Sequence, residues 1–343
     1  MTSMPPMEAG RQARVKVRTA PGNPPAQLTP PGGAIWATLI TKAAYLPGLL
    51  TLNYSLRKSG SAYPLVALYT DSVPPSCLAA IRARDIPLRR IEYIQPSAGG
   101  SYDEDPRFLD CWSKLAVFSL TEYSRVVLLD SDMLVLQNMD ELMTLELDDP
   151  RTAAAGSGTR VFAAGHACVC NPFGKKHYPP TWVRENCAFT KMHASPAMAQ
   201  VSGGSCTLSP LGNLNSGLLV INPSLEVFAQ VVAYMEAHAG RMLFPDQDVL
   251  TELFRGRWVA LPYVYNALKT MPAKETHSAI WRPDKVKNVH YILEPKPWVE
   301  VDTKEASDWT SEVREWWVKM DWERRQAERR EAKEDFEEGD SLR

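Results

Sequence analysis

Two carboxylates separated by a single small residue follow the most apolar strand-like run of this chain. Asp130 and Asp132 flank Ser131 and come directly after residues 126–129, which read Val-Val-Leu-Leu. A run without polar alternation favours a strand that is buried on both faces of an α/β sheet. Ligands of such sheets bind beyond the carboxyl ends of the strands, where two carboxylates could share one hard cation that carries a phosphate. A surface turn is the alternative, because Asp and Ser are common turn residues.

Three further segments put polar side chains at the edges of expected buried elements. They are Asn215-Ser216-Gly217 before an apolar run, Asp246-Gln247-Asp248 at the start of a helical pattern, and His290 at a strand end with Lys296 six residues later. Each segment alone is a weak signal. A single histidine after a strand, for example, is more often a structural residue than a metal ligand.

The elements that would position these groups alternate along the first part of the chain. Strands are expected at residues 34–41, 65–69, 88–94 and 126–129, separated by helices at 45–58, 74–83 and 110–121. This alternation predicts a parallel sheet with right-handed crossovers. Further strands are expected at 160–164, 217–221 and 286–292, and further helices at 224–238, 246–254 and 308–338. The fold class is therefore predicted to be α/β, with a mostly parallel central sheet and a C-terminal helix.

The chain of 343 residues is long enough for one large α/β domain between two tails. Residues 1–33 contain seven of the 27 prolines and no hydrophobic period, which indicates a disordered tail. The expected domain spans residues 34–300, and within it the long, weakly patterned segment 166–214 is typical of a functional loop. Residues 301–343 are expected to form a charged helix or tail, of which 323–338 would be solvated or disordered.

Composition excludes several classes of function. A formal net charge of −2 argues against nucleic-acid binding. No stretch is long and apolar enough to span a bilayer, and the first thirty residues lack the apolar core of a secretory signal. We therefore expect a cytoplasmic protein whose six cysteines are thiols. Neither common glycine-rich phosphate loop occurs, so a nucleotide would be held another way, most simply by a metal between carboxylates and diphosphate.

The order of these motifs resembles that of the family 8 retaining glycosyltransferases, the group that contains glycogenin and plant galactinol synthase. The resemblance covers roughly residues 34–298. Supporting matches are Thr38-Leu39-Ile40-Thr41 with Tyr45, Lys114, and Leu261-Pro262-Tyr263-Val264-Tyr265-Asn266. Trp316-Trp317 in the last helix looks more like galactinol synthase than glycogenin. The resemblance implies a single Rossmann-like, nucleotide-sugar-binding domain of the GT-A type.

The resemblance also implies roles for individual residues. Mn²⁺ would be bound by Asp130, Asp132 and His290, whose oxygen and imidazole ligands suit a borderline divalent ion. The nucleotide and its phosphates would contact Leu39, Thr41, Tyr45, Ser131 and Lys296, and the sugar would contact Lys114, Asn215 and Ser216. The Gln247 side-chain oxygen would support an oxocarbenium-like centre during front-face attack with retention. A double displacement through Asp246 is the alternative route.

By the same resemblance, the chain is expected to transfer a hexose from UDP-glucose or UDP-galactose. A small polyol such as myo-inositol would be a galactinol-synthase-like acceptor, and a protein tyrosine or growing glucan a glycogenin-like one. We favour the non-self acceptor because segment 132–215 is long. A catalytically silent nucleotide-sugar-binding protein is the competing class. The sequence departs from glycogenin at two places near the donor: it has Leu243-Phe244-Pro245 for Asp-Gly-Gly, and Leu293 for Gly. The identity of the donor sugar is therefore left open. Whether the protein forms a homodimer is also left open.

Four cysteines lie within the long segment, namely Cys168, Cys170, Cys187 and Cys206, with His166, His177 and His193 nearby. Residues of these types build Cys₃His and Cys₄ zinc sites, although C-x-C is not the usual C-x₂₋₄-C spacing. Buried thiols and solvent-facing histidines are the alternative. The sequence leaves zinc binding open and indicates only that this segment covers the acceptor side.

Overall fold

A computed structural model describes residues 33–98, 102, 108–206, 211–299 and 311–341. Apart from Gly33, the expected proline-rich tail lies outside the described residues, as do residues 301–310 before the C-terminal helix.

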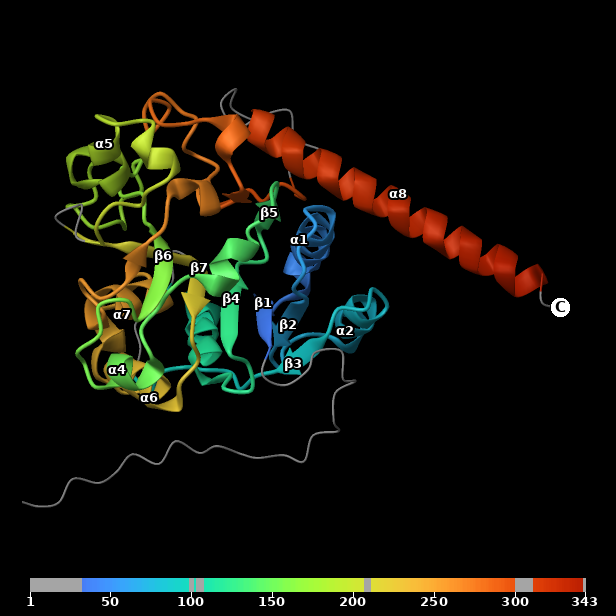
Figure 1. Cartoon of the computed structure of the whole chain (residues 1–343), viewed down its shortest axis with the longest axis horizontal. Helices are drawn as coiled ribbons and strands as arrows, with labels where there is room; N and C mark the ends of the chain where they lie inside the picture. The colour runs from blue at the N-terminus through green and yellow to red at the C-terminus, as the bar shows by residue number, and fades with distance from the viewer. Residues whose placement is uncertain (1–32, 99–101, 103–107, 207–210, 300–310, 342–343) are drawn as a thin grey trace, which may run out of the picture.

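Within the described residues, the centre of the fold is a seven-stranded sheet in the order β3-β2-β1-β4-β7-β6-β8 (Figure 1). Its strands are β1 (Ala34–Ile40), β2 (Leu65–Tyr69), β3 (Leu88–Arg90), β4 (Arg125–Leu129), β6 (Phe162–His166), β7 (Leu214–Ile221) and β8 (Val259–Ala260). Strand β7 runs antiparallel to β4 and β6, whereas the other pairs are parallel. The mostly parallel sheet confirms the predicted α/β class.

The apolar run before the carboxylates is buried on both sides. Successive residues of a strand point to opposite faces, so Val126 and Leu128 join one hydrophobic cluster, and Val127 and Leu129 join another. None of the four has exposed surface. The strand therefore ends abruptly at the first polar residue, Asp130, as its sequence predicts.

Helices cover both faces of the sheet (Figure 1). They are α1 (Leu46–Lys58), α2 (Pro75–Arg82), α3 (Phe108–Cys111), α4 (Pro150–Ala154), α5 (Ala188–Met192), α6 (Leu225–His238), α7 (Pro245–Leu253) and α8 (Ser311–Ser341). Helices α6 and α7 pack in the cluster that contains Val126, while α1 supplies Leu52 and Leu56 to the cluster that contains Val127.

Several expected elements are shorter or less regular than predicted. The helix expected at 110–121 is α3 followed by a 3₁₀ helix, Trp112–Ser119. The strand expected at 88–94 pairs only over β3, because the Ile94 amide then turns to the Ser113 hydroxyl. In its described residues, segment 166–214 contains the last residue of β6, α5, two short 3₁₀ helices and the first residue of β7, and is otherwise irregular.

A second, three-stranded sheet is an element that the sequence pattern did not predict. It consists of β5 (Met133–Val135), β10 (Asn288–His290) and β9 (Ala267–Leu268), in that order. Strand β10 runs antiparallel to β5 and places His290 opposite Met133. This pairing brings a residue from late in the chain beside the carboxylate turn.

Helix α8 packs on α1 and then projects beyond the body of the molecule (Figure 1). Asp321 is buried, accepts a hydrogen bond from Thr51 of α1 at 2.9 Å, and pairs with Arg324 at 2.6 Å. Further along α8, Glu328 pairs with Arg84 at 2.8 Å. The first part of the segment expected to be solvated or disordered is thus a helix tied to the body.

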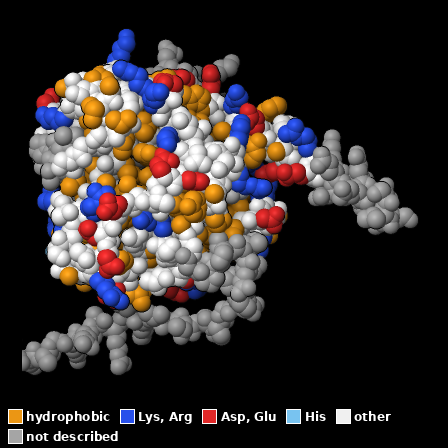
Figure 2. Space-filling view, viewed as in Figure 1, with side chains coloured by type: hydrophobic (Ala, Val, Ile, Leu, Met, Phe, Trp, Pro, Cys, Tyr) orange, Lys and Arg blue, Asp and Glu red, His pale blue; other side chains and the backbone are white. Residues whose placement is uncertain are grey.

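One face of the described chain carries charges of both signs. On the face shown in Figure 2, basic and acidic side chains are interspersed. Among the helices of the described residues, none is both long and apolar enough to cross a lipid bilayer. The cytoplasmic location and the oligomeric state stay predictions.

Candidate active site

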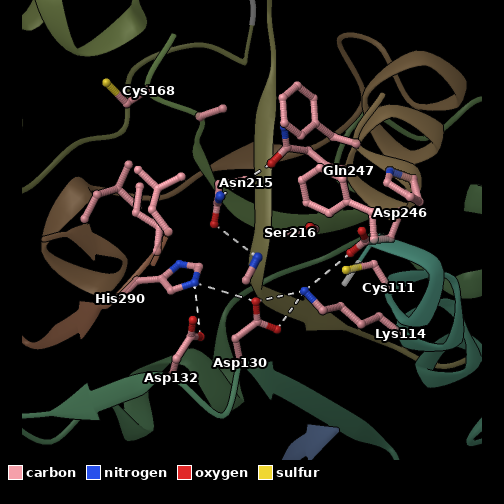
Figure 3. A pocket seen from close by; sticks show the side chains of 18 of the residues that line it. Cys111, Lys114, Asp130, Asp132, Cys168, Asn215, Ser216, Asp246, Gln247 and His290 are labelled. Carbon is pink, nitrogen blue, oxygen red and sulfur yellow. Dashed lines mark hydrogen bonds and ion pairs between the residues drawn. The ribbon is translucent and has the colours of Figure 1, made fainter. Parts of the chain in front are cut away.

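The carboxylate turn is held in place by the ends of its neighbouring strands. Directly after β4, the Asp130 amide donates a hydrogen bond to the Gly217 carbonyl of β7 at 2.8 Å. The Ser131 hydroxyl donates to the Leu39 carbonyl of β1 at 2.7 Å. Ser131 thus fixes the turn against β1, which leaves the carboxylates of Asp130 and Asp132 to face the cavity beyond the strand ends (Figure 3).

His290 completes a cluster of three groups that could hold a metal ion. Its Nε2 lies 3.3 Å from Asp132 Oδ1 and 3.6 Å from Asp130 Oδ2. On the other side of the ring, Nδ1 lies 3.0 Å from Asn266 Oδ1. Since an amide oxygen only accepts, Nδ1 carries a proton, and Nε2 is the ring nitrogen that faces the carboxylates and could bind a metal ion. Such an orienting hydrogen bond is typical of metal-binding histidines, and the donor set fits Mn²⁺.

A glycine makes the approach of His290 feasible. A Cβ at Gly217 would lie 2.3 Å from Cε1 and 2.7 Å from Nδ1 of the His290 ring. Ring and backbone cannot yield by that amount without displacing β7 or β10. A side chain at Gly217 would therefore prevent His290 from reaching Asp130 and Asp132.

Two lysines pair with the carboxylates. Lys114 Nζ lies 2.8 Å from Asp130 and 3.6 Å from Asp246, while Lys296 Nζ lies 2.5 Å from Asp132. Burial opposes ionisation of Asp132, but Lys296 and His290 outweigh it and hold its pKa well below the usual range. Burial instead raises the pKa of Asp130, against the attraction of Lys114. The site therefore stabilises charge on Asp132 more strongly than on Asp130.

A chain of hydrogen-bonded amide side chains runs from His290 to α7. Asn266 Nδ2 donates to Asn215 Oδ1 at 2.8 Å, and Asn215 Nδ2 donates to Gln247 Oε1 at 3.4 Å. Asp246 and Gln247 lie in the first turn of α7 and are buried, although both line the cavity. The orientation of Gln247 is thus linked through Asn215 and Asn266 to that of His290; Figure 3 shows the Asn215–Gln247 part of this chain.

Aromatic rings support the opposite part of the cavity. Tyr45 lies before α1, and its ring meets Trp298 edge-on at 5.8 Å between centroids. Trp298 in turn lies 5.7 Å from Trp317 of α8. Lys296 Nζ is 6.0 Å from the Tyr45 ring centre. The C-terminal helix therefore braces the wall that contains Tyr45 and Lys296.

The thirteen residues to which the sequence assigned roles all line one cavity of the described chain. They are Leu39, Thr41, Tyr45, Lys114, Asp130, Ser131, Asp132, Asn215, Ser216, Asp246, Gln247, His290 and Lys296. Asn266 was quoted only as part of a family segment, and its bond to His290 was not foreseen. Trp298, which is not part of any of the motifs, packs on Tyr45.

A second group of aromatic residues lines the cavity on the side of segment 166–214. Trp182 stacks on Phe244 at 4.6 Å and 9°, while Tyr178 and Phe108 meet Phe244 edge-on. All four line the cavity. Phe244, one of the three residues that replace Asp-Gly-Gly, is thus the centre of this wall.

Known proteins resemble the chain in sequence and in fold. Galactinol synthase 4 of Arabidopsis thaliana is 26% identical over 304 residues, which cover 85% of this chain and 82% of the relative. Galactinol synthase 1 of Solanum lycopersicum is 27% identical over 288 residues, 80% of this chain and 77% of the relative. The crystal structure of the galactosyltransferase LgtC in complex with donor and acceptor sugar analogs superposes with a TM-score of 0.53 at 17% identity, covering 84% of this chain and 96% of that one.

These likenesses confirm the predicted GT-A type fold. The model of glycosyl transferase family 8 matches residues 37–302. That match covers most of the chain, including both carboxylates of the turn, the Asn-Ser-Gly segment, His290 and Lys296. The chain belongs to glycosyl transferase family 8.

Proposed function

We propose that this glycosyltransferase moves a hexose, with retention, from a UDP-hexose to a hydroxyl of a small polyol or another non-self acceptor, and that it requires Mn²⁺. The observation that carries the proposal is the convergence of Asp130, Asp132 and His290 at one cavity that Lys296 and Gln247 also line. The galactinol synthases among the relatives favour the polyol acceptor.

The charges of the site support a need for metal. At the strand ends, three carboxylates, Asp130, Asp132 and Asp246, pair with two lysines, Lys114 and Lys296, which leaves one net negative charge at this place. A diphosphate beside Asp130 and Asp132 would be repelled by their carboxylates unless a divalent cation lay between them. Bound at Asp130, Asp132 and His290, Mn²⁺ would act as a Lewis acid that stabilises charge on departing UDP.

The protein's own groups would then hold and orient the donor. Lys296 adds a point charge beside the phosphates, and Tyr45, braced by Trp298, offers a face to uracil. Lys114, Asn215 and Ser216 hold the sugar hydroxyls. The Gln247 oxygen supports the anomeric centre while a phosphate oxygen takes the acceptor's proton. Asp246 is engaged by Lys114, so we favour this front-face route over attack by Asp246.

The aromatic wall supports a small acceptor. Trp182, Tyr178 and Phe244 offer apolar faces against which a ring with axial C–H groups can pack, and Lys175 and His177 line the same side. A glycogenin-like reaction would instead bring a tyrosine of the protein to the cavity. Within the described residues, the tyrosines that line it are Tyr45 and Tyr178, and both pack against other aromatic rings.

A donor test decides whether the enzyme class is right. The full-length protein is incubated with UDP-glucose or UDP-galactose and myo-inositol, with and without Mn²⁺, and UDP release and products are measured. We expect UDP release only with Mn²⁺ and a hexosylated polyol. UDP binding without turnover of either donor would support the silent binding protein and contradict the proposal.

An acceptor test separates the two family activities. The intact mass of the protein is measured after incubation with each donor and Mn²⁺ alone. An unchanged mass is expected, because the acceptor is a free molecule. Stepwise addition of hexose units would instead show a self-glycosylating, glycogenin-like protein.

A further inference from the structure

A second cluster of metal-ligating side chains lies in the segment on the acceptor side of the cavity. Cys168 and Cys170 follow β6, Cys187 comes directly before α5, and His277 lies between β9 and β10. The three sulfurs and one ring nitrogen lie within 4.8 Å of one another. Three stretches of chain that are far apart in sequence therefore meet at four ligand atoms.

The distances from the His277 ring nitrogen to the three sulfurs are close to those of a tetrahedron around an ion. His277 Nε2 lies 3.2 Å from Cys168 Sγ and 3.5 Å from both Cys170 Sγ and Cys187 Sγ. With Zn–S bonds of about 2.3 Å and a Zn–N bond of about 2.0–2.1 Å, tetrahedral geometry puts nitrogen about 3.5 Å from each sulfur. A single ring nitrogen carries at most one proton and can donate to one sulfur only, so hydrogen bonding does not account for all three contacts.

A second histidine orients the first. His277 Nδ1 lies 3.1 Å from His193 Nε2, and Phe189 packs edge-on against the His277 ring at 5.3 Å. When Nδ1 donates its proton to His193, Nε2 presents its lone pair to the three sulfurs. Metal-binding histidines are commonly fixed by such a bond to the nitrogen that does not bind the metal.

The cluster is partly buried and its thiols are not paired in disulfides. His277 and Cys187 have no exposed surface, Cys168 and Cys170 are half-buried, and all three cysteines are free. Four protein ligands fill a tetrahedron and leave no position for substrate, which distinguishes structural from catalytic zinc. Thiolate-rich sets also select zinc over hard cations.

We propose that Cys168, Cys170, Cys187 and His277 bind a structural zinc ion. Three of the sequence's candidates take no part: Cys206 packs against the main core, His166 bonds the Gly203 carbonyl at 3.1 Å, and His177 lines the active-site cavity beside Tyr178. His277 was not a candidate, because it lies 90 residues after Cys187 in an irregular stretch.

The ion would hold in place the part of the cavity wall that is formed by the chain between Cys170 and Cys187. Chain between Cys170 and Cys187 supplies Asn171, Lys175 and Tyr178 to the cavity lining, yet this stretch forms little regular structure. Metal binding supplies folding free energy to such loops. In Figure 3, Cys168 lies at the rim with its sulfur directed away from Asp130 and Asp132. That this part of the wall receives the acceptor rests on the proposed function, whereas zinc binding does not.

Metal content of the purified full-length protein tests the site. After growth in ordinary medium and desalting, elemental analysis should find about one zinc per chain in the native protein and in Cys206→Ser. Cys170→Ser, which changes a half-buried ligand, should lose most of the zinc, as should His277→Ala. Equal zinc in Cys170→Ser and Cys206→Ser would overturn the assignment, whatever the outcome of the donor test.

Cobalt substitution covers the case in which the variants do not fold. Protein produced with Co²⁺ in place of Zn²⁺ should show the thiolate charge-transfer and intense visible bands of tetrahedral cobalt. Native protein without zinc, without these bands, and with a disulfide or three freely titrating thiols at Cys168, Cys170 and Cys187 would overturn the proposal.

Discussion

Two clusters of metal-ligating residues occur in the described part of this chain, and they solve opposite problems. Asp130, Asp132 and His290 offer three hard or borderline ligands at the open end of a cavity. The Cys₃His cluster offers four mostly soft ligands, enough to fill a tetrahedral coordination shell. Ligand number decides whether substrate can reach the ion, and ligand softness decides which ion enters. The two proposals therefore predict an exchangeable ion at the first cluster and a tightly held ion at the second.

In both clusters the metal-facing histidine is oriented by a hydrogen bond to its other ring nitrogen. In each, the histidine Nε2 faces the other ligands while Nδ1 bonds a neighbouring side chain, Asn266 for His290 and His193 for His277. The first histidine is fixed by a strand of the small sheet and the second by loops. This shared arrangement allows matched experiments that perturb one cluster and use the other as control.

The largest effect is expected for Asp132→Asn. Asparagine lacks the charge with which Asp132 pairs with Lys296 and would bind the cation. We therefore expect kcat/KM to fall by about 10³, because a bound metal typically stabilises the transition state by several kcal/mol. Asn is preferred to Ala because Lys296 is buried and Ala would remove its partner entirely. UDP release is measured with Mn²⁺, and zinc content should stay unchanged. Exposed Asp284→Asn is the control and should keep full activity.

Chelation should separate the clusters nearly as sharply. Dialysis against EDTA should abolish UDP release, and added Mn²⁺ should restore it, because the three-ligand site exchanges its ion readily. The zinc content and the thermal unfolding midpoint should change little over the same period. Loss of both metals together, with irreversible unfolding, would contradict the assignment of one open and one closed site.

Substitution of the orienting residues should give smaller, crossed effects. Asn266→Ala should weaken Mn²⁺-dependent UDP binding by about 10–100-fold, and His193→Ala should weaken zinc retention by a similar factor. Neither change should alter the other metal. Asn266→Asp keeps an acceptor for His290 Nδ1 and should recover part of the affinity, which a purely structural role for Asn266 would not explain.

The contrast also shows how far the sequence could lead. Asp130 and Asp132 follow a strand whose burial is readable from its apolar run, and the ends of parallel strands meet at one edge, so the first cluster was predictable. The pairing of β10 with β5 was not, because three-residue strands have no periodicity. The second cluster is built from loops. The Cys168-x-Cys170 motif of this cluster can be recognised in the sequence. That His277 belongs to the cluster and Cys206 does not depends on tertiary packing, which no local sequence pattern predicts.

The smallest effect concerns α7, which positions Asp246 and Gln247 beside the first cluster. Burial raises the pKa of Asp248 to about 6, even though its carboxylate accepts hydrogen bonds from the Leu243 and Phe244 amides at 2.9 Å. Because this pKa exceeds the ordinary value of 3.8, the folded protein binds the proton more tightly than the unfolded one. Stability from this group is present below pH 4 and is lost as pH rises through about 6.

Asp248→Asn removes that titration while the amide oxygen can accept the same two hydrogen bonds. Relative to the variant, the native protein should therefore lose about 2–3 kcal/mol of unfolding free energy between pH 4 and pH 7. Urea unfolding of both proteins across this range, each loaded with zinc, gives the difference directly and cancels the titration of the metal ligands. Parallel pH curves would show that Asp248 ionises with its ordinary pKa and would contradict this prediction. Any pH dependence of activity would then be attributed to Asp130, Asp132 and His290 rather than to α7.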